Sequence, residues 1–195
     1  GDGVGVNVTP LPNGNYVVSS PYWKNGTATN AGAVTWASGT GGLTGPVTSS
    51  NSLVGSSAND QIGDAISPGR IIALTNSNYV VVSPRWNNGA VADAGAVTWG
   101  SGTGGTVGPV SAANSLVGTS TNEQTGVGDV TALANGNYVV NSPYWKNGAV
   151  GNAGAVTWGS GTAGVHGPIS SANSLVGSSP DDGVYNSVIG LANGN

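Results

Sequence analysis

A block of 21 residues occurs three times in this chain and constrains its fold more than any other feature. The copies span Tyr16–Trp36, Tyr79–Trp99 and Tyr138–Trp158, and 14 of the 21 positions hold the same residue in all three, with no insertion or deletion. The final tryptophans are separated by 63 residues and then by 59. Self-similarity at such a period indicates a repeat architecture, in which each copy is one supersecondary unit.

Composition narrows the class of protein further. The 195 residues include 35 glycines, only 6% are charged and none is cysteine. Glycine without a strict three-residue period excludes collagen and indicates many tight turns. The net charge of −4 comes without any basic patch, so nucleic-acid binding is not expected. No apolar run reaches the roughly 20 residues of a membrane helix, so membrane insertion is not expected either.

Each copy is expected to contain four short strands. In the first copy they are predicted at about residues 6–11, 16–20, 33–37 and 47–54. Pro21 ends the second strand because proline cannot donate to a sheet ladder. Alternation in the third strand places Val34 and Trp36 on one face and Ala33 and Thr35 on the other. No segment has the apolar rhythm of a helix.

Four strands in a repeat of this length favour a propeller blade over a solenoid coil, which usually runs about 20 to 30 residues. The sequence therefore predicts an all-β repeat protein with four-stranded, propeller-type blades. Residues 1–55, 56–118 and 119–177 are predicted to be three full repeats, and residues 178–195 a variable loop and the first strand of a fourth. Closed propellers have about 4 to 8 blades, so we expect the chain to belong to a longer array or to be completed by another chain.

The order of motifs resembles the FG-GAP repeat of integrin α-subunit propellers. The motifs are Leu-Val-Gly-Ser-Ser-Ala-Asn-Asp-Gln-Ile-Gly at 53–63, Asn-Tyr-Val-Val-Val-Ser-Pro at 78–84 and Ala-Gly-Ala-Val-Thr-Trp at 94–99. The chain is also similar to repeats of unknown function in bacterial surface proteins of the filamentous-haemagglutinin type. These resemblances imply a role in adhesion. This sequence departs from the FG-GAP pattern at Ile62, where the family has Phe. It also departs at the family's calcium loop, which here is reduced to turns such as Asn13-Gly14-Asn15.

Neither a metal site nor a catalytic centre is predicted. The six acidic residues considered as ligands are Asp60, Asp64, Glu123, Asp129, Asp181 and Asp182. None has the Asp-x-Asp-x-Asp-Gly spacing of a calcium loop, so we expect solvated loop acids and no cofactor; the alternative is a weak Ca²⁺ site of Asn side chains and carbonyls. The single histidine, His166, has no recurring nucleophile or carboxylate to work with, so no enzymatic activity is expected.

The aromatic residues form two repeating groups. Trp36, Trp99 and Trp158 lie inside strands and are expected in the core. A second tryptophan follows the proline that ends the second strand, beside Tyr or Arg and an Asn-Gly turn. This group gives the candidate ligand-binding residues Tyr22, Trp23, Asn25, Arg85, Trp86, Asn88, Tyr144, Trp145 and Asn147. Aromatic rings with nearby amides suit carbohydrate, whereas the alternative is that these tryptophans cap each blade.

The sequence thus favours a non-catalytic, extracellular or cell-surface bacterial module for adhesion or ligand and protein binding. The richness in Gly, Ser, Thr and Asn supports that location. One alternative is a structural spacer or self-assembling filament or ring subunit, and another is a carbohydrate-binding lectin. The expected partners are neighbouring repeats or other copies of the chain, and a glycan or cell-surface ligand.

Overall fold

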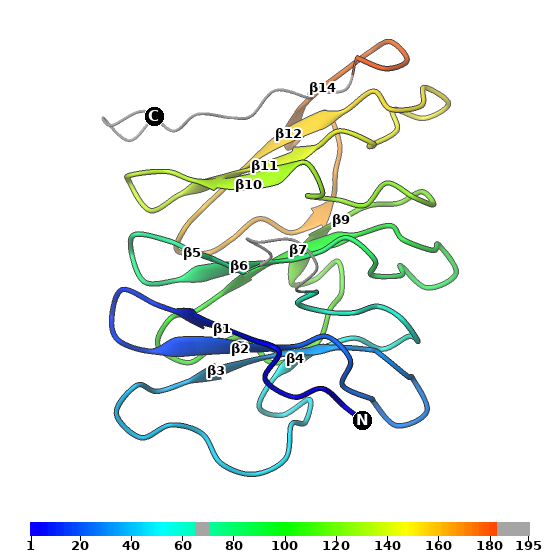
Figure 1. Ribbon diagram of the computed structural model, residues 1–195. Coiled ribbons are helices and arrows are strands. Elements are labelled where there is room, and N and C mark those ends of the chain that lie inside the picture. Colours follow the sequence, from blue (N-terminus) through cyan, green and yellow to red (C-terminus); the bar gives the residue numbers. More distant parts are fainter. Residues whose placement is uncertain (65–70, 183–195) are drawn as a thin grey trace.

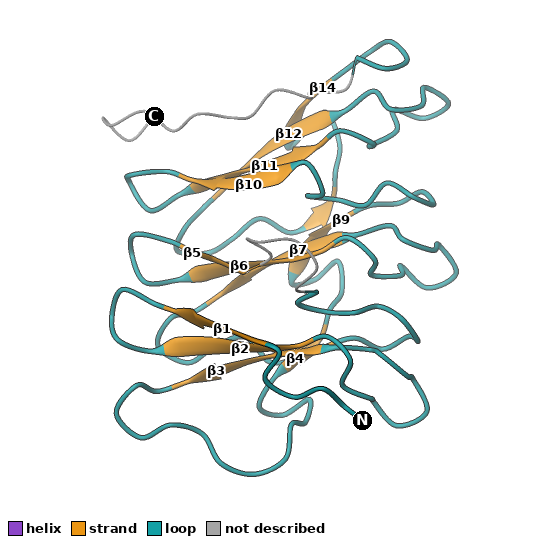
Figure 2. Ribbon diagram, viewed as in Figure 1, coloured by secondary structure: helices purple, strands orange, loops and turns teal. Residues whose placement is uncertain are grey.

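The computed structural model describes residues 1–64 and 71–182, and in that part it contains strands, turns and loops but no helix (Figures 1 and 2). Sheet 1 contains β1 (Asn7–Pro10), β2 (Tyr16–Ser20), β3 (Ala33–Ala37) and β4 (Leu53–Val54). Sheet 2 contains β5 (Ile71–Ala73), β6 (Tyr79–Ser83), β7 (Ala96–Gly100) and β9 (Ser115–Val117). Sheet 3 contains β10 (Asp129–Ala132), β11 (Tyr138–Ser142), β12 (Ala155–Gly159) and β14 (Ser174–Val176).

Within each repeat the four strands pair antiparallel in chain order, and the three sheets stack face to face (Figure 1). The register is the same in each repeat, as shown by the pairs Tyr16↔Ala37, Tyr79↔Gly100 and Tyr138↔Gly159. The predicted fold class, an all-β repeat protein built from four-stranded sheets, is confirmed. The strand predicted for a fourth repeat falls within residues 183–195, outside the described residues.

A tight turn joins the first two strands of each repeat. In repeat 1 the backbone N–H of Leu11 donates to the carbonyl of Asn15 over 2.8 Å. Gly14 closes the turn with a φ of 85°, in the left-handed region that glycine enters without steric cost. The Asn-Gly signal in the sequence therefore marks this hairpin correctly.

The predicted fourth strand is wrong in its extent, because only its end belongs to the repeat's own sheet. In repeat 1 just Leu53–Val54 forms β4. In repeats 2 and 3 the preceding Gly-Pro pairs form separate strands, β8 (Gly108–Pro109) and β13 (Gly167–Pro168), each of which joins the sheet of the previous repeat. A proline lacks the N–H that a central strand needs, which is why this segment pairs at a sheet edge.

Two hydrophobic cores fill the spaces between the sheets. Sheet 2 contributes to both, because Tyr79 and Val81 face the core shared with sheet 1, whereas Val80 and Val82 face the core shared with sheet 3. All five residues of β6 are buried. The run of apolar residues in this strand is thus explained by burial on both faces.

The described residues leave one apolar face of sheet 3 uncovered, as the leucine of the Ser-Leu-Val motif shows. Leu53 and Leu116 are 1% and 0% exposed, whereas Leu175 in the last sheet is 78% exposed. Trp36 and Trp99 pack against the cores, as predicted, but Trp158 is 56% exposed. Position in the stack, rather than local sequence, therefore decides whether these side chains are buried.

Two buried tyrosines make the stability of the fold sensitive to alkaline pH. Burial raises the pKa of Tyr79 and of Tyr138 from 10.0 to about 12. Because the folded-state pKa is raised, the stabilisation is present in full below pH 10 and is lost as the pH rises through about 12. We expect the free energy of unfolding to fall over that window by about 2 to 3 kcal/mol for each ring. Urea titrations at increasing pH would measure it, and an unchanged pH dependence in a Tyr79→Phe, Tyr138→Phe variant would contradict it.

Candidate functional site

The candidate ligand-binding residues lie on three equivalent loops, 21–32, 84–95 and 143–154, which follow the second strand of each repeat and stack along one side of the molecule (Figure 1). We call this surface the loop edge. Each loop is closed by a pair of backbone hydrogen bonds, such as those between Asn25 and Ala28, of 3.1 and 2.9 Å. The loops are therefore built alike and are held at the spacing of the sheets.

The asparagines of the loop edge hold these loops to their own sheets. The Nδ2 atoms of Asn25, Asn88 and Asn147 donate to the carbonyls of Gly55, Gly118 and Gly177 over 2.8, 3.0 and 3.0 Å. Each glycine directly follows the fourth strand of the same repeat. The amide donors predicted for a ligand thus have an internal structural role.

Burial separates two of the three loop tryptophans from a ligand-binding role. Trp86 and Trp145 are 4% and 5% exposed and belong to the cores between the sheets. Trp23 in repeat 1 is half-buried. A ring face that packs against a neighbouring sheet cannot stack on a soluble ligand, so the geometry favours the capping interpretation.

The residue before each tryptophan points outward instead. Tyr22 is 41% exposed and Tyr144 is 39% exposed. Arg85 occupies the equivalent place in repeat 2, where its Nη1 lies 3.4 Å from Oδ2 of Asp64 and donates to the side chain of Gln61. Of the nine candidates, the two tyrosines are therefore the aromatic groups that the loop edge presents to solvent.

Three of the six acidic residues are buried, so the prediction that all of them are solvated is wrong. Asp60 and Glu123 are both fully buried, at 0% exposure. Oδ2 of Asp60 accepts the backbone N–H groups of Ser56 and Ser57, over 2.9 and 2.8 Å. Its Oδ1 accepts from Asn87 of the next repeat, from the backbone N over 3.0 Å and from Nδ2 over 2.8 Å. Burial outweighs these hydrogen bonds and raises the pKa of Asp60 above its usual value.

Glu123 makes the same connection between repeats 2 and 3. Its Oε2 accepts from the backbone N of Thr119 and Ser120, over 2.6 and 3.0 Å, and its Oε1 accepts from the backbone N of Lys146 over 3.1 Å. The sequence held a signal for this role, since Asp60, Glu123 and Asp182 each follow a strand tryptophan by 24 residues. Asp64 is also buried, whereas Asp129, Asp181 and Asp182 are exposed, as predicted.

Comparison with known families identifies the repeat. The family model described as "Repeat of unknown function (DUF5650)" matches residues 10–64, 73–127 and 132–186, which together make up most of the chain. The chain belongs to this family. Comparison with curated proteins finds no match. The DUF5650 units begin near the first hairpin of each repeat, and the first two extend past the buried acids, so each of these two contains the acid that contacts the following unit.

The turns interpreted as reduced calcium loops also connect one DUF5650 repeat to the next. Nδ2 of Asn13 and Nδ2 of Asn15 both donate to the carbonyl of Gly102 in repeat 2, over 2.8 Å. Their amide oxygens accept from the backbone N–H groups of Asn15 and Gly39. Because those oxygens already face N–H donors, the geometry does not favour the cation alternative. Among residues 1–64 and 71–182 no three His, Asp or Glu side chains are grouped to hold a metal ion.

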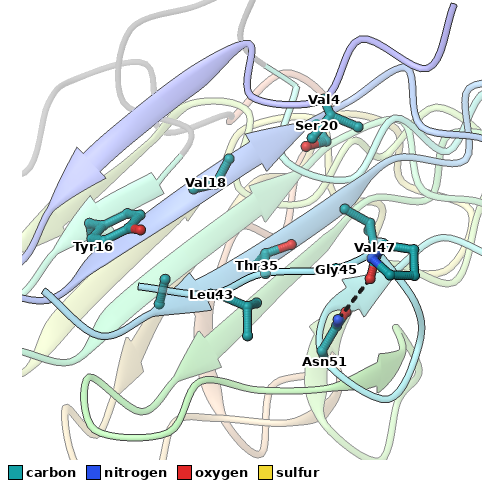
Figure 3. Close-up of a pocket in the computed structure, with 11 residues that line it drawn as sticks. Val4, Tyr16, Val18, Ser20, Thr35, Leu43, Gly45, Val47 and Asn51 are labelled. Carbon is teal, nitrogen blue, oxygen red and sulfur yellow. Dashed lines mark hydrogen bonds between the residues drawn. The ribbon is translucent and has the colours of Figure 1, made fainter. Parts of the chain in front are cut away.

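A shallow apolar pocket of about 130 Å³ lies on the outer face of sheet 1 (Figure 3). Its lining includes Tyr16 and Val18 from β2, Thr35 from β3, and Leu43 and Val47 from the loop that follows β3. None of the described residues that line it has a charged side chain. In sheets 2 and 3 the equivalent face packs against the preceding sheet, so the pocket lies on a face of the kind through which repeats contact one another.

Two further features bear on function. His166 is exposed, at a place where the equivalent residues, Thr44 and Val107, are exposed too. In the part of the chain that the structure describes, no helix is long and apolar enough to cross a bilayer.

Proposed function

We propose that this chain is a non-catalytic, extracellular repeat module whose loop edge binds a ligand or another protein, as part of an adhesive surface. The observation that carries the proposal is the stacking of three equivalent loops along one side of the molecule (Figure 1). Two of these loops expose a tyrosine, Tyr22 or Tyr144, next in sequence to the half-buried Trp23 or the buried Trp145. Exposed tyrosines on a rigid support are a common feature of protein-binding surfaces, because the ring buries a large area at low entropic cost.

The chemistry of the loop edge supports binding rather than catalysis. A lysine follows the Tyr-Trp pair in two of the loops, as Lys24 and Lys146. The loop edge therefore combines aromatic rings with positive charge, although the chain as a whole is acidic. The motif resemblance to FG-GAP and haemagglutinin-type repeats adds an analogy with adhesion proteins. The abundance of Gly, Ser, Thr and Asn adds support for a location outside the cell.

The test is binding of the labelled chain to a glycan array and to an array of extracellular-matrix proteins. We expect binding to at least one array, and a loss of about tenfold or more in affinity when Tyr22 and Tyr144 are both replaced by serine, since buried interface tyrosines often contribute more than about 1 kcal/mol each. Val8→Ser, an exposed change on β1, is the matched control. Equal binding by the double variant, or none by the parent chain, would contradict the proposal.

A structural spacer is the second candidate, and the identical contacts between successive repeats favour it. A spacer would show no binding on either array and would keep a cooperative unfolding transition. A lectin is the third candidate, but burial of Trp86 and Trp145 means that sugar would stack on Tyr22, Trp23 or Tyr144 rather than on those two rings.

A further inference from the structure

The two junctions between repeats are built in the same way, first through strand addition. β8 of repeat 2 pairs parallel with β4 of repeat 1, and the N–H of Val110 donates to the carbonyl of Val54 over 3.1 Å. β13 of repeat 3 pairs parallel with β9 of repeat 2, and the N–H of Ile169 donates to the carbonyl of Val117 over 3.1 Å. Each repeat therefore completes the sheet of the repeat before it.

A tryptophan and a glycine form the second part of each junction. Nε1 of Trp36 donates to the carbonyl of Gly102 over 3.0 Å, and Nε1 of Trp99 does the same to Gly161. The Trp36 side chain also lies on Gly105, where an added Cβ would be 2.7 Å from the Cβ of the tryptophan. Trp99 has the same relation, at the same distance, to Gly164. The glycine is required at this place because the tryptophan occupies the space of its side chain.

Sheet 3 has the strand edge, the tryptophan and the acid that form one half of this junction, and no described residue of another repeat contacts them. β14 has no strand paired beyond it, Leu175 is 78% exposed and Trp158 is 56% exposed. Asp182 accepts the backbone N–H groups of Ser178 and Ser179, as Asp60 does from Ser56 and Ser57, but is exposed. Its Oδ1 is equivalent to the oxygens with which Asp60 and Glu123 accept from the next repeat.

The opposite end carries the matching half. Gly42 is equivalent to Gly105 and Gly164, and an added Cβ there would meet only the hydroxyl of Tyr16, at 3.7 Å. Gly45–Pro46 is equivalent to β8 and β13, and Val47 is half-buried where Val110 and Ile169 are both 4% exposed. Lys24 has the position of Asn87 and Lys146, whose backbone N–H groups reach the acid of the preceding repeat.

We propose that a second copy of this chain stacks end to end on sheet 3, with its Gly45–Val47 segment added parallel to β14. In that contact Trp158 of one copy packs on Gly42 of the next, Leu175 becomes buried, and Asp182 accepts from the backbone N–H of Lys24. The proposal goes beyond the proposed function and does not depend on it. A second copy is the occupant because both halves of the junction are present in the one chain and match the contacts already made twice within it.

The contact joins two different surfaces, so it does not close on itself in a dimer. Such heterologous contacts produce rings when the rotation between copies closes, and filaments when it does not. The two apolar end faces supply the driving force, since burying them removes apolar area from water.

The test is sedimentation velocity of the chain over a concentration series. We expect oligomers that grow with concentration, and we expect either of two variants to remain monomeric. Gly42→Asn introduces a side chain tolerated at the positive φ of 66° into space that is open in the monomer but needed by Trp158. Leu175→Glu places a charge where the contact would bury it. Both sites are open in the monomer, so the melting temperature of each dilute variant should match the parent.

Mixing the two variants gives the decisive result. Gly42→Asn keeps the sheet 3 end intact and Leu175→Glu keeps the sheet 1 end intact, so an equal mixture should form a heterodimer and nothing larger. Tyr22→Ser on the loop edge is the matched control and should assemble like the parent. A parent chain that stays monomeric, a mixture that does not associate, or single variants that still self-associate would each overturn the proposal.

A shortened chain that ends at Asp182 tests an alternative, in which the chain's own residues 183–195 cover sheet 3 in place of a second copy. We expect the shortened chain to assemble as the parent does. A monomeric parent together with a shortened chain that assembles would overturn the assignment to a second copy.

Discussion

Leu116→Ala is expected to lower the free energy of unfolding by about 2 to 5 kcal/mol, the range for removing a leucine from a packed core. Leu116 is 0% exposed between sheets 2 and 3. The matched change, Leu175→Ala, alters the same Ser-Leu-Val motif at a place that is 78% exposed, and its effect is expected to stay within about 0.5 kcal/mol. Urea unfolding followed by tryptophan fluorescence measures both.

This pair isolates the contribution of the neighbouring repeat. The two leucines have the same residues on either side and occupy equivalent strands, β9 and β14. The measurement belongs at low protein concentration, where Leu175 is not covered by a second copy. If both variants lost the same free energy, burial between stacked sheets would not be the source of stability, and the repeat-stacking account of the fold would be wrong.

A strand could be predicted from sequence where it pairs only within its own repeat's sheet. The second and third strands of repeat 1 lie at 16–20 and 33–37 as predicted, because Pro21 and the alternation around Val34 and Trp36 are local signals. The fourth strand could not be predicted in the same way. In repeats 2 and 3 the Gly-Pro pair that precedes the equivalent segment pairs with the sheet of the previous repeat, and nothing in the local sequence indicates a partner a repeat away.

The candidate site was predictable in part for a related reason. The position of the loops at one edge follows from the strand order, so the sequence could indicate that the three loops lie on the same side of the molecule. The roles of their residues could not be predicted, because a tryptophan after a strand can face solvent or a neighbouring sheet. Only the stack shows that Trp86 and Trp145 face inward. The acids were misjudged because each was compared with calcium-loop spacing rather than with its equivalent in the next copy.

Glu123→Ala is expected to lower the free energy of unfolding by about 2 kcal/mol or more, because hydrogen bonds to a charged group contribute about 1.5 to 3 kcal/mol and these are partly shielded from water. The change removes the acceptor of three backbone N–H groups, those of Thr119, Ser120 and Lys146. Because Lys146 belongs to the next repeat, the loss should appear both in urea unfolding and as faster hydrogen exchange at the Lys146 amide.

Two matched variants sharpen the Glu123 prediction. Asp182→Ala removes the equivalent acid at the exposed end of the stack, where water replaces the lost acceptor, so we expect about 1 kcal/mol or less. Glu123→Asp installs the residue that stands at the equivalent position 60, and it should recover most of the lost free energy because a carboxylate again faces the same donors. A Glu123→Ala variant as stable as the parent, with the Lys146 amide still protected, would show that repeats 2 and 3 are joined by their apolar faces alone. The recurrence of an acid 24 residues after each strand tryptophan would then need another explanation.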